Sequence, residues 1–556
     1  MKPLPIMASL HRLLGRKTVN GATTWFTRGV TSPQRLGTPR PNPGDIIAGI
    51  SVALVLIPQS LAYAEIAGVP PHVGLFAAAL PPLVAAPFMS SPYLQTGPVA
   101  LTSLLTFGAL SGLEEVRSED YVKAAALLAL IVGITRMLLG LLRMGTVAYL
   151  MSQPVLQGFT TGAAILIVSS QLPSMFGVSP ETDGVLERAW WSIVHPDEWS
   201  AVAIALTVVT IVVVLGARKV HNLFPGVLLV VIGATAWSEL SDYDGPTIGA
   251  LPGDFLSLSL DLPFGKFSDL VVPGIIIALV GFAEPASISR TFAAADRIPW
   301  SANRELVSSG IANMTSAISG AFPVGGSFSR SSLNRFAGAT SNWSGAVTGL
   351  VVIAALPLAS NLEPLPRAVL GAVVFTAVFR LIQPAPIIRM WRQSAPQAAI
   401  ATGTFVATLA FSPNVERGVL LGVALAIGFH LYREMRVDHV HELEGDTIVI
   451  RPTGVVWFAS TPALEDAFRA AVREHPDASE IRIDFANCGR LDYSGASTLS
   501  ETIDDLTGDG YDVTIVNIPT HAQRSLAVFL GGSHGVPELG ELSSSTRYQW
   551  IAPWRK

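Results

Sequence analysis

GGSFSRSSLN, residues 325–334, stands late in a long run of apolar segments, yet it carries four serines, an asparagine and an arginine. The surrounding pattern places this stretch inside a membrane. A charged side chain at the bilayer centre costs at least about 2.5 kcal/mol, so Arg330 needs a partner there. The stretch is therefore the first candidate for a functional site.

The composition indicates a polytopic membrane protein. Half of the 556 residues are apolar, 14% are charged against about 25% in ordinary globular proteins, and mean hydropathy is +0.48. Apolar stretches of spanning length recur from about residue 46 to about residue 431, and the first starts too late for a cleaved signal peptide. The single cysteine, Cys488, excludes an intramolecular disulfide. A net charge of −5 gives no indication of nucleic-acid binding.

We expect fourteen membrane spans, an even number that places both termini on one side. They lie near residues 46–64, 73–89, 97–111, 122–142, 153–172, 200–217, 224–238, 270–288, 306–322, 327–340, 345–360, 368–382, 396–411 and 416–431.

The charges of the connecting segments support this topology. With the N-terminus inside, the cytoplasmic connections hold most of the cations, as the positive-inside rule requires. These are Arg143, Arg218, Lys219, Arg290, Arg297, Arg304, Arg389 and Arg392. The acids gather in the external segments 114–120, 181–198 and 239–254, and the single external exceptions are Arg117, Arg188, Lys266 and Arg367. We therefore expect a multi-pass protein of the plasma (inner) membrane with cytoplasmic termini.

Polar segments flank the transmembrane domain, which we place at 45–432. Residues 1–44 are expected to form a cytoplasmic tail, 437–545 a soluble domain and 546–556 a C-terminal tail. In the soluble domain, strands are predicted on both sides of the turn in HELEGDTIVIRPTGVVWF (441–458), in IRIDFANC (481–488) and in YDVTIVNI (511–518). Helices are predicted in ALEDAFRAAVRE (463–474) and GASTLSETIDDL (495–506). Alternating strands and helices predict a small α/β domain, cytoplasmic because it follows the last span.

Two of the fourteen spans are poor membrane helices. The third begins at a Gly-Pro pair in TGPVALTSLLTFGAL (96–110), and the tenth is the serine-rich stretch quoted above. In two halves of seven spans these are corresponding elements, and such matched, interrupted segments indicate the midplane site of a transporter. Each short helix would begin near the bilayer centre, with its free N–H groups and positive dipole end facing the other. This arrangement predicts an anion site.

The candidate substrate-binding residues follow from these two helix starts. Val99 and Ala100 begin the third element, and Phe328, Ser329 and Arg330 begin the tenth. The arginine would supply a cation and the serines hydroxyl donors. The alternative is that Arg330 pairs with a carboxylate for structural reasons and the serines join helices. Arg330 stands at the start of one of the two matched segments, and this position favours the substrate-binding role over the structural one.

Glu284 is the only acid in the apolar run VVPGIIIALVGFAEPASISR (271–290). Burial favours its neutral form, whereas a nearby Arg330 favours the carboxylate. A group under these opposing influences suits proton coupling, because it can take up a proton on one side and release it on the other. A structural ion pair with Arg330 is the alternative.

The first span, ISVALVLIPQSLAYAEIAG (50–68), is interrupted at Pro58 and carries Gln59 and Tyr63. These two side chains are four residues apart and lie on one helical face. They could donate hydrogen bonds to an oxyanion, or they could equally join neighbouring helices.

Two long motifs resemble those of the SulP (sulfate permease) family of anion transporters. They are LVLIPQSLAYAEIAGVPPHVGLFAAALPPLVAAPFMSSPYLQTGPVAL (54–101) and EPASISRTFAAADRIPWSANRELVSSGIANMTSAISGAFPVGGSFSRSSLN (284–334). The resemblance implies an α-helical fold of seven-plus-seven inverted repeats, a core domain that moves against a gate domain, and a homodimer.

The GSFSRS pattern is similar to that of plant-type sulfate carriers. This likeness implies roles in sulfate and proton binding for Ser329, Arg330 and Glu284, with Gln59 and Tyr63 in the first span. The sodium-dependent bicarbonate branch usually has aspartate in the eighth span and lacks the arginine, and this chain departs from it on both counts. Sulfate with proton symport is therefore expected. Sodium-coupled bicarbonate transport, transport of a dicarboxylate such as fumarate, and passive conduction through an anion channel are the alternatives.

The soluble domain resembles the STAS domain that these transporters carry. Its Asp492, Ser494 and Gly495 resemble the D-x-S-G loop of anti-sigma-factor antagonists, in which the serine is phosphorylated. A phosphate group is electrostatically favourable at a helix N-terminus, so Ser494 is a candidate site of regulatory phosphorylation. The alternative is that the Ser494 side chain caps the helix. No cofactor or metal is expected. An enzyme is not expected either, because His72 and His430 stand alone in the spans.

The predicted topology can be tested with single cysteines at positions 183 and 445. A membrane-impermeant thiol reagent added to intact cells should modify position 183, which is predicted to be external, and should leave position 445 unmodified. Modification of position 445 in sealed cells would contradict the topology.

Overall fold

The computed structural model describes residues 42–113, 115–146, 151–182, 184–220, 225–249, 258, 261–435 and 438–518. The predicted tails lie outside these residues except for 42–44, as do position 183 and the end of the predicted soluble domain. The chain forms two compact units, Met1–Val423 and Ala424–Lys556. The predicted domain limits, 45–432 and 437–545, stay a prediction.

Each of the fourteen predicted spans contains a helix. These helices are α3 (Pro43–Ala67), α4 (Pro71–Ala85), α5 (Ala100–Leu110), α6 (Glu119–Leu141), α7 (Gln153–Phe176), α9 (Ala201–Val220), α10 (Gly226–Leu240), α11 (Phe267–Asp296), α12 (Ala302–Ile318), α13 (Phe328–Phe336), α14 (Trp343–Ala355), α15 (Arg367–Val378), α17 (Ala395–Ala410) and α18 (Val415–Glu434). Among the described residues, 8 helices are long and apolar enough to cross a membrane by themselves. The amphipathic helices α8 (Val185–Val194) and α16 (Pro384–Gln393) lie between predicted spans.

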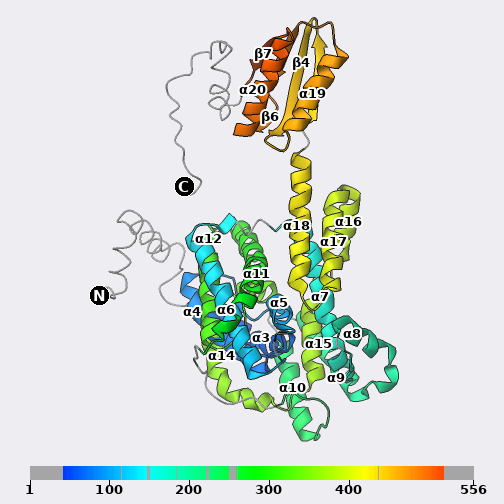
Figure 1. Ribbon diagram of the computed structural model, residues 1–556. Helices are drawn as coiled ribbons and strands as arrows, with labels where there is room; N and C mark the ends of the chain where they lie inside the picture. Colours follow the sequence, from blue (N-terminus) through cyan, green and yellow to red (C-terminus); the bar gives the residue numbers. More distant parts are fainter. Residues whose placement is uncertain are drawn as a thin grey trace, which may run out of the picture. The chain divides into compact units, whose positions relative to one another are not determined.

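The helices of the first unit pack in two groups, which correspond to the expected core and gate. In the core, α12 packs on α4 and α6, α14 on α3 and α4, and α11 on α5 and α6. In the gate, α7 packs on α15 and α17, and α9 on α10 and α15. Figure 1 shows the labels of the two groups on opposite sides of the unit.

Small residues let the core helices approach closely. A Cβ added to Gly133 of α6 would lie 2.9 Å from the carbonyl oxygen of Gly310 in α12. One added to Gly310 would lie 2.7 Å from the backbone nitrogen of Met137. Any larger side chain would force the two helices apart, as at other close helix crossings in membranes.

Arg136 of α6 is completely buried, and it joins three parts of the core. Its Nε donates to the carbonyl of Ala278 (3.0 Å) and its Nη2 to that of Ile277 (3.2 Å), both in α11. Its Nη1 donates to Ser309 Oγ of α12 (2.9 Å) and to the carbonyl of Val324 (3.1 Å). Every nitrogen of this guanidinium thus has an acceptor, so Arg136 is a structural residue.

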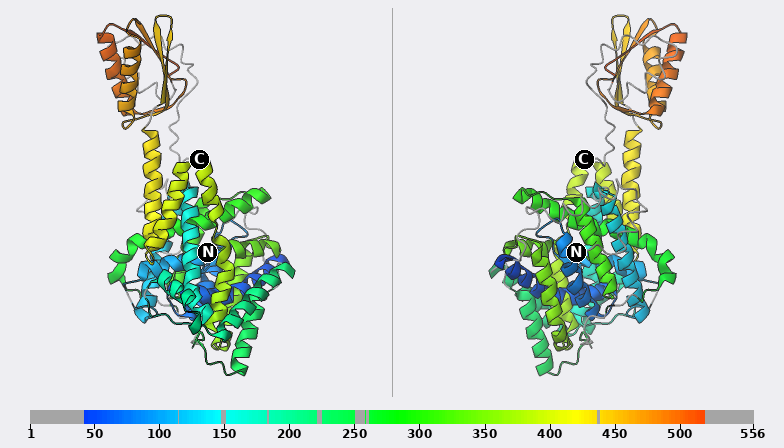
Figure 2. Two further views of the ribbon diagram at one scale, coloured as in Figure 1. Left: turned by 90° about the vertical axis from the view of Figure 1, so that its right-hand side faces the viewer. Right: turned by 90° about the vertical axis from the view of Figure 1, so that its left-hand side faces the viewer.

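The second unit contains a 5-stranded sheet in the order β3-β4-β5-β7, with β6 paired to β4. Its strands are β3 (Asp438–Glu444), β4 (Thr447–Val456), β5 (Glu480–Asp484), β6 (Cys488–Leu491) and β7 (Asp512–Val516), and its helices are α19 (Thr461–Glu474) and α20 (Tyr493–Gly508). Only β3 runs antiparallel to its neighbour. Figure 2 shows both helices on the same face of the sheet.

This arrangement confirms the predicted α/β domain and adds β6, which was not predicted. The apolar positions of alternating strands, such as Ile448, Ile450, Ile481 and Ile483, form its core with α19 and α20. The four residues of β6 follow directly after a turn and are too few for an alternating pattern to be visible in the sequence.

The alternative role for Ser494, that it caps the helix, is wrong. Asp492 is the N-cap of α20, and its carboxylate accepts a hydrogen bond from the backbone N–H of Gly495 (2.8 Å). Ser494 follows as the second helical residue and is half-buried. Its phosphorylation stays a prediction.

Replacement of Arg136 by alanine should destabilise the transmembrane unit. The change removes four hydrogen bonds to buried oxygen atoms, and loss of one partner from a buried charged network costs about 3–5 kcal/mol. Thermal unfolding of the purified protein in detergent should show a markedly lower midpoint. Arg389→Ala, at an exposed position of α16, is the matched control. An unchanged midpoint for Arg136→Ala would contradict the structural role.

Candidate functional site

The two interrupted segments meet in a short antiparallel ladder. β1 (Thr96–Gly97) pairs with β2 (Gly325–Gly326), with Thr96 opposite Gly326. The ladder leads directly into α5 and α13, whose lengths are 11 and 9 residues. The third and tenth elements therefore begin side by side, as their matched positions predicted. Neither helix has a side-chain cap at its N-terminus.

Side chains of α13 fasten it to the segment around β1. Gln95 donates its backbone N–H to Ser331 Oγ (2.9 Å), and its carbonyl accepts from the backbone N–H of Ser327 (3.1 Å). Asn334 Nδ2 donates to the carbonyl of Tyr93 (3.1 Å). Ser331 and Asn334 therefore attach α13 to the segment around β1. These contacts set the orientation of the helix and so of its other polar side chains.

Arg330 is buried without an acceptor. Its side chain is 1% exposed, and none of its three guanidinium nitrogens has a hydrogen-bond partner among the described residues. It lies beside the ladder, because a Cβ added to Gly97 would be 3.6 Å from Nη2. The contrast with Arg136 is direct: both arginines are buried at bilayer depth, and only Arg136 has its donors satisfied. An unpaired buried cation is costly, so Arg330 requires an anion.

Glu284 of α11 is the nearest candidate for a protein anion. Its carboxylate interacts with the charge of Arg330 and with the backbone N–H of Phe328 at the start of α13. No hydrogen bond joins Glu284 to Arg330, because all guanidinium nitrogens lack a partner. The two charges interact without a hydrogen bond, so the structural ion pair and the proton-coupling role of Glu284 both stay predictions. The carboxylate faces the helix N-terminus instead, which leaves the donors of Arg330 available.

A cavity of about 640 Å³ opens in front of Arg330, between α3 and α13 of the core and α9, α10 and the short helix η6 (Phe379–Leu381) of the gate. Three of the predicted site residues line it: Gln59, Ser329 and Arg330. Gln59 is 3% exposed and its Oε1 has no hydrogen-bond partner among the described residues. Val55, Val214, Leu215, Lys219, Gly226, Val227, Ser332, Leu333, Phe336 and Arg380 complete the lining.

The other predicted site residues do not line this cavity. Tyr63 is buried on α3, where it interacts electrostatically with Arg330. Val99 and Ala100 are buried at the start of α5. The side chain of Phe328 is 53% exposed and stacks on Phe292, with 6.0 Å between ring centroids. Val99, Ala100 and Phe328 can thus contribute only their backbone groups.

Lys219 and Arg380 also line the cavity, and neither is among the residues that the sequence predicts for the site. Lys219 stands near the end of α9, where the charge pattern indicates only a cation of a cytoplasmic connection. Arg380 lies in η6, inside a predicted span, and a charge at such a position is itself a signal of function. Both side chains are exposed and line the cavity with Arg330. Three cations and no carboxylate among the lining residues suit a small anion.

The comparisons with known proteins agree with this chemistry. The model of the sulfate permease family matches residues 43–404, and a STAS-domain model matches residues 439–531. A protein of Arabidopsis thaliana named "Probable sulfate transporter 4.2" is 29% identical over 513 residues, which cover 85% of this chain and 76% of that protein. A probable sulfate transporter of Mycobacterium tuberculosis is 33% identical over 406 residues, which cover 72% and 71%. The solved structure of SLC26A9 is similar in fold, with a TM-score of 0.82, 18% identity and coverage of 95% and 91%.

Proposed function

Because the chain belongs to the sulfate permease family, we propose that it is a secondary active transporter of an inorganic oxyanion, with sulfate as substrate and protons as the driving ion. Members of this family transport anions, so the chain is a transporter and not an enzyme. The observation that carries the proposal is Arg330, buried beside two helix N-termini with all of its donors unused.

The residues that line the cavity supply hydrogen-bond donors and positive charge, which are the groups that bind a tetrahedral dianion. Arg330 offers directed N–H donors in a charge-assisted geometry, and such hydrogen bonds are roughly twice as strong as neutral ones. Gln59 and Ser329 offer an amide and a hydroxyl on the same cavity. The first turns of α5 and α13 add the positive ends of two helix dipoles. Lys219 and Arg380 raise the local anion concentration along the approach.

Transport proceeds by alternating access in this proposal. The cavity separates core helices from gate helices, so a movement of one group against the other would open and close it. Lys219 and Gly226, at facing ends of α9 and α10, stand at the connection that the charge pattern places in the cytoplasm. The conformation is therefore interpreted as inward-open, in the plasma (inner) membrane, with the N-terminus and the STAS domain in the cytoplasm. A homodimer, as implied by the resemblance, is also part of the proposal.

Arg330→Ala should weaken sulfate binding by about 2–4 kcal/mol, or roughly 30- to 1,000-fold in Kd, because it removes charge-assisted donors from the anion. Calorimetry on the purified protein measures the effect. Arg335→Ala is the matched control, since Arg335 lies on the same helix but pairs with Asp296 and is far more exposed. Wild-type affinity in Arg330→Ala would remove this residue from the site.

Substrate identity is tested by uptake of radiolabelled sulfate into proteoliposomes, in competition with bicarbonate and with fumarate. Oxyanions of similar size use the same donors, so the competition decides among them. Sulfate should be accumulated against its gradient, with saturation. Stronger competition by bicarbonate together with a sodium requirement would favour a sodium-coupled bicarbonate carrier, and flux without accumulation would favour a channel.

Coupling is expected to depend on Glu284. A dianion at Arg330 reduces the compensation that the arginine provides to this carboxylate, so anion binding should favour its protonated form. By linkage, the proton then favours the anion by the same factor, and uptake should increase as the external pH falls.

Glu284→Gln mimics the protonated form. It should bind sulfate, lose the pH dependence of uptake, and fail to accumulate sulfate when only a proton gradient is supplied. Glu416→Gln, a buried acid of α18 away from the cavity, should behave like the wild type. Uphill accumulation by Glu284→Gln equal to that of the wild type would rule out this proton mechanism.

A further inference from the structure

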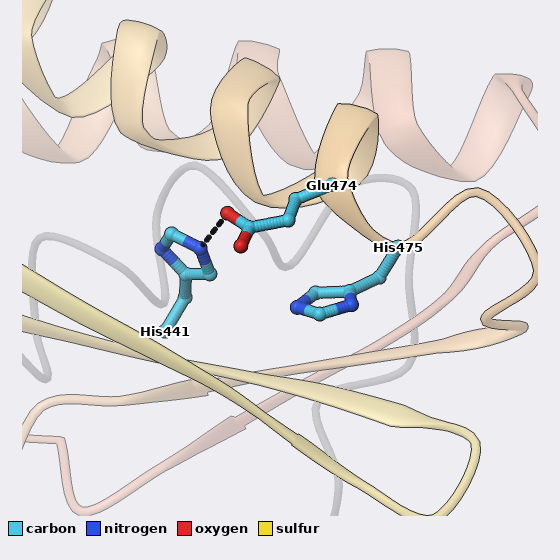
Figure 3. A group of neighbouring side chains, drawn as sticks. All are labelled: His441, Glu474 and His475. Atoms are coloured by element: carbon cyan, nitrogen blue, oxygen red, sulfur yellow. Dashed lines mark hydrogen bonds and ion pairs between the residues drawn. The ribbon is translucent and has the colours of Figure 1, made fainter.

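Three potential metal ligands converge in the STAS domain, away from the transport cavity. His441 stands on strand β3, and Glu474 and His475 stand at the end of helix α19. Figure 3 shows the three side chains turned toward one another across the gap between strand and helix. One ligand atom from each lies within 4.8 Å of the other two. Nothing in the sequence pattern brings them together, because 33 residues separate His441 from Glu474.

We propose that His441, Glu474 and His475 form a binding site for a divalent transition-metal ion, with Zn²⁺ as the best-fitting ion. Two imidazoles and one carboxylate are a known ligand set for zinc, and a fourth position remains for water. Imidazole nitrogen also suits Cu²⁺ and Ni²⁺, whereas Mg²⁺ and Ca²⁺ prefer sites made of oxygen ligands. The proposal is independent of the transported anion.

Binding of a zinc ion requires the three ligand atoms to move slightly closer together. His441 Nε2 and Glu474 Oε2 are 2.8 Å apart and share a hydrogen bond, and the ring centroids of the two histidines are 5.9 Å apart. Ligand atoms at about 2.0–2.2 Å from a tetrahedral zinc ion lie roughly 3.3–3.6 Å from one another. The most distant pair of ligand atoms must therefore close by at most about 1.5 Å. Glu474 is exposed and flexible, and the half-buried His475 follows the last residue of α19, so both can move by this amount.

The position of the site suggests what the ion would do. Among the strands of the described residues 438–518, β3 lies at the edge of the sheet and pairs with β4 alone. A metal ion held by His441 on one side and by Glu474 and His475 on the other would cross-link this edge strand to α19. Because the ion binds the folded domain and not the unfolded chain, it should stabilise the domain by mass action.

The test uses the full-length protein, purified with a histidine-free tag and stripped of metal with a chelator. Titration with ZnCl₂, followed by calorimetry and by elemental analysis after gel filtration, should show one ion bound per chain. His441→Ala and His475→Ala should each weaken Zn²⁺ binding by at least 100-fold, and Glu474→Gln by at least tenfold. Zn²⁺ should also raise the thermal midpoint of the wild type and not that of these variants, whereas Mg²⁺ and Ca²⁺ should have no effect.

Two matched controls separate this site from general metal binding at the surface. Glu465→Gln removes a carboxylate from the same helix, and His430→Ala removes a histidine from α18, so both should bind Zn²⁺ like the wild type. Co²⁺ provides a second readout, because coordination by two imidazoles produces visible absorption that the His441→Ala variant should lose. Binding only at millimolar Zn²⁺, or unchanged binding by the His441→Ala/His475→Ala double variant, would overturn the proposal.

Discussion

Backbone N–H and C=O groups at bilayer depth have no water to bind, so each must find its partner within the protein. This constraint governs the centre of the molecule, where two helices are interrupted. The ladder between Thr96–Gly97 and Gly325–Gly326 satisfies part of the exposed backbone there, and Gln95, Ser331 and Asn334 satisfy more through side chains. The first turns of α5 and α13 remain uncapped. The carboxylate of Glu284 faces the start of α13, and two helix N-termini that lie side by side are suited to binding an anion.

The two buried arginines show how the same residue type serves two purposes. Arg136 contacts four acceptors from three parts of the core, and its charge is spread into a network that holds α6, α11 and α12 together. The guanidinium of Arg330 has no hydrogen-bond acceptor among the described residues. The free energy needed to keep Arg330 in place must come from the surrounding packing, which Arg136 and the glycine contact between α6 and α12 help to provide. In this sense the packed core holds a buried guanidinium whose hydrogen-bond donors are unused among the described residues.

The gate contributes differently from the core. Its helices α9 and α10 and the turn η6 bring Lys219 and Arg380 to the cavity, on exposed side chains with long flexible stems. Flexible exposed cations of this kind suit attraction of an anion, whereas a buried guanidinium with directed donors suits fixing its geometry. A division of this kind suits a carrier in which one group of helices holds the substrate and the other opens and closes the path.

Much of this protein follows from its sequence alone. Hydropathy and the side preference of charges predicted the helices, and the two interrupted segments predicted that the third and tenth elements begin side by side. These signals are local in the chain or repeat along it. Alternation of apolar residues predicted the strands and helices of the STAS domain except for the short β6. The choice among serines could not be made in this way. Ser331 bonds to Gln95, 236 positions away, while Ser329 faces the cavity, and only packing separates them.

The tertiary structure alone decided the remaining features. It placed Glu284 near Arg330 without a hydrogen bond between them, added Lys219 and Arg380 to the cavity, and brought His441 to Glu474 and His475. Each depends on the relative placement of elements distant in sequence, which is set by how whole helices and strands pack. A local pattern carries no record of that packing, because the same residue can face a neighbour, a cavity or solvent according to what the rest of the chain places beside it.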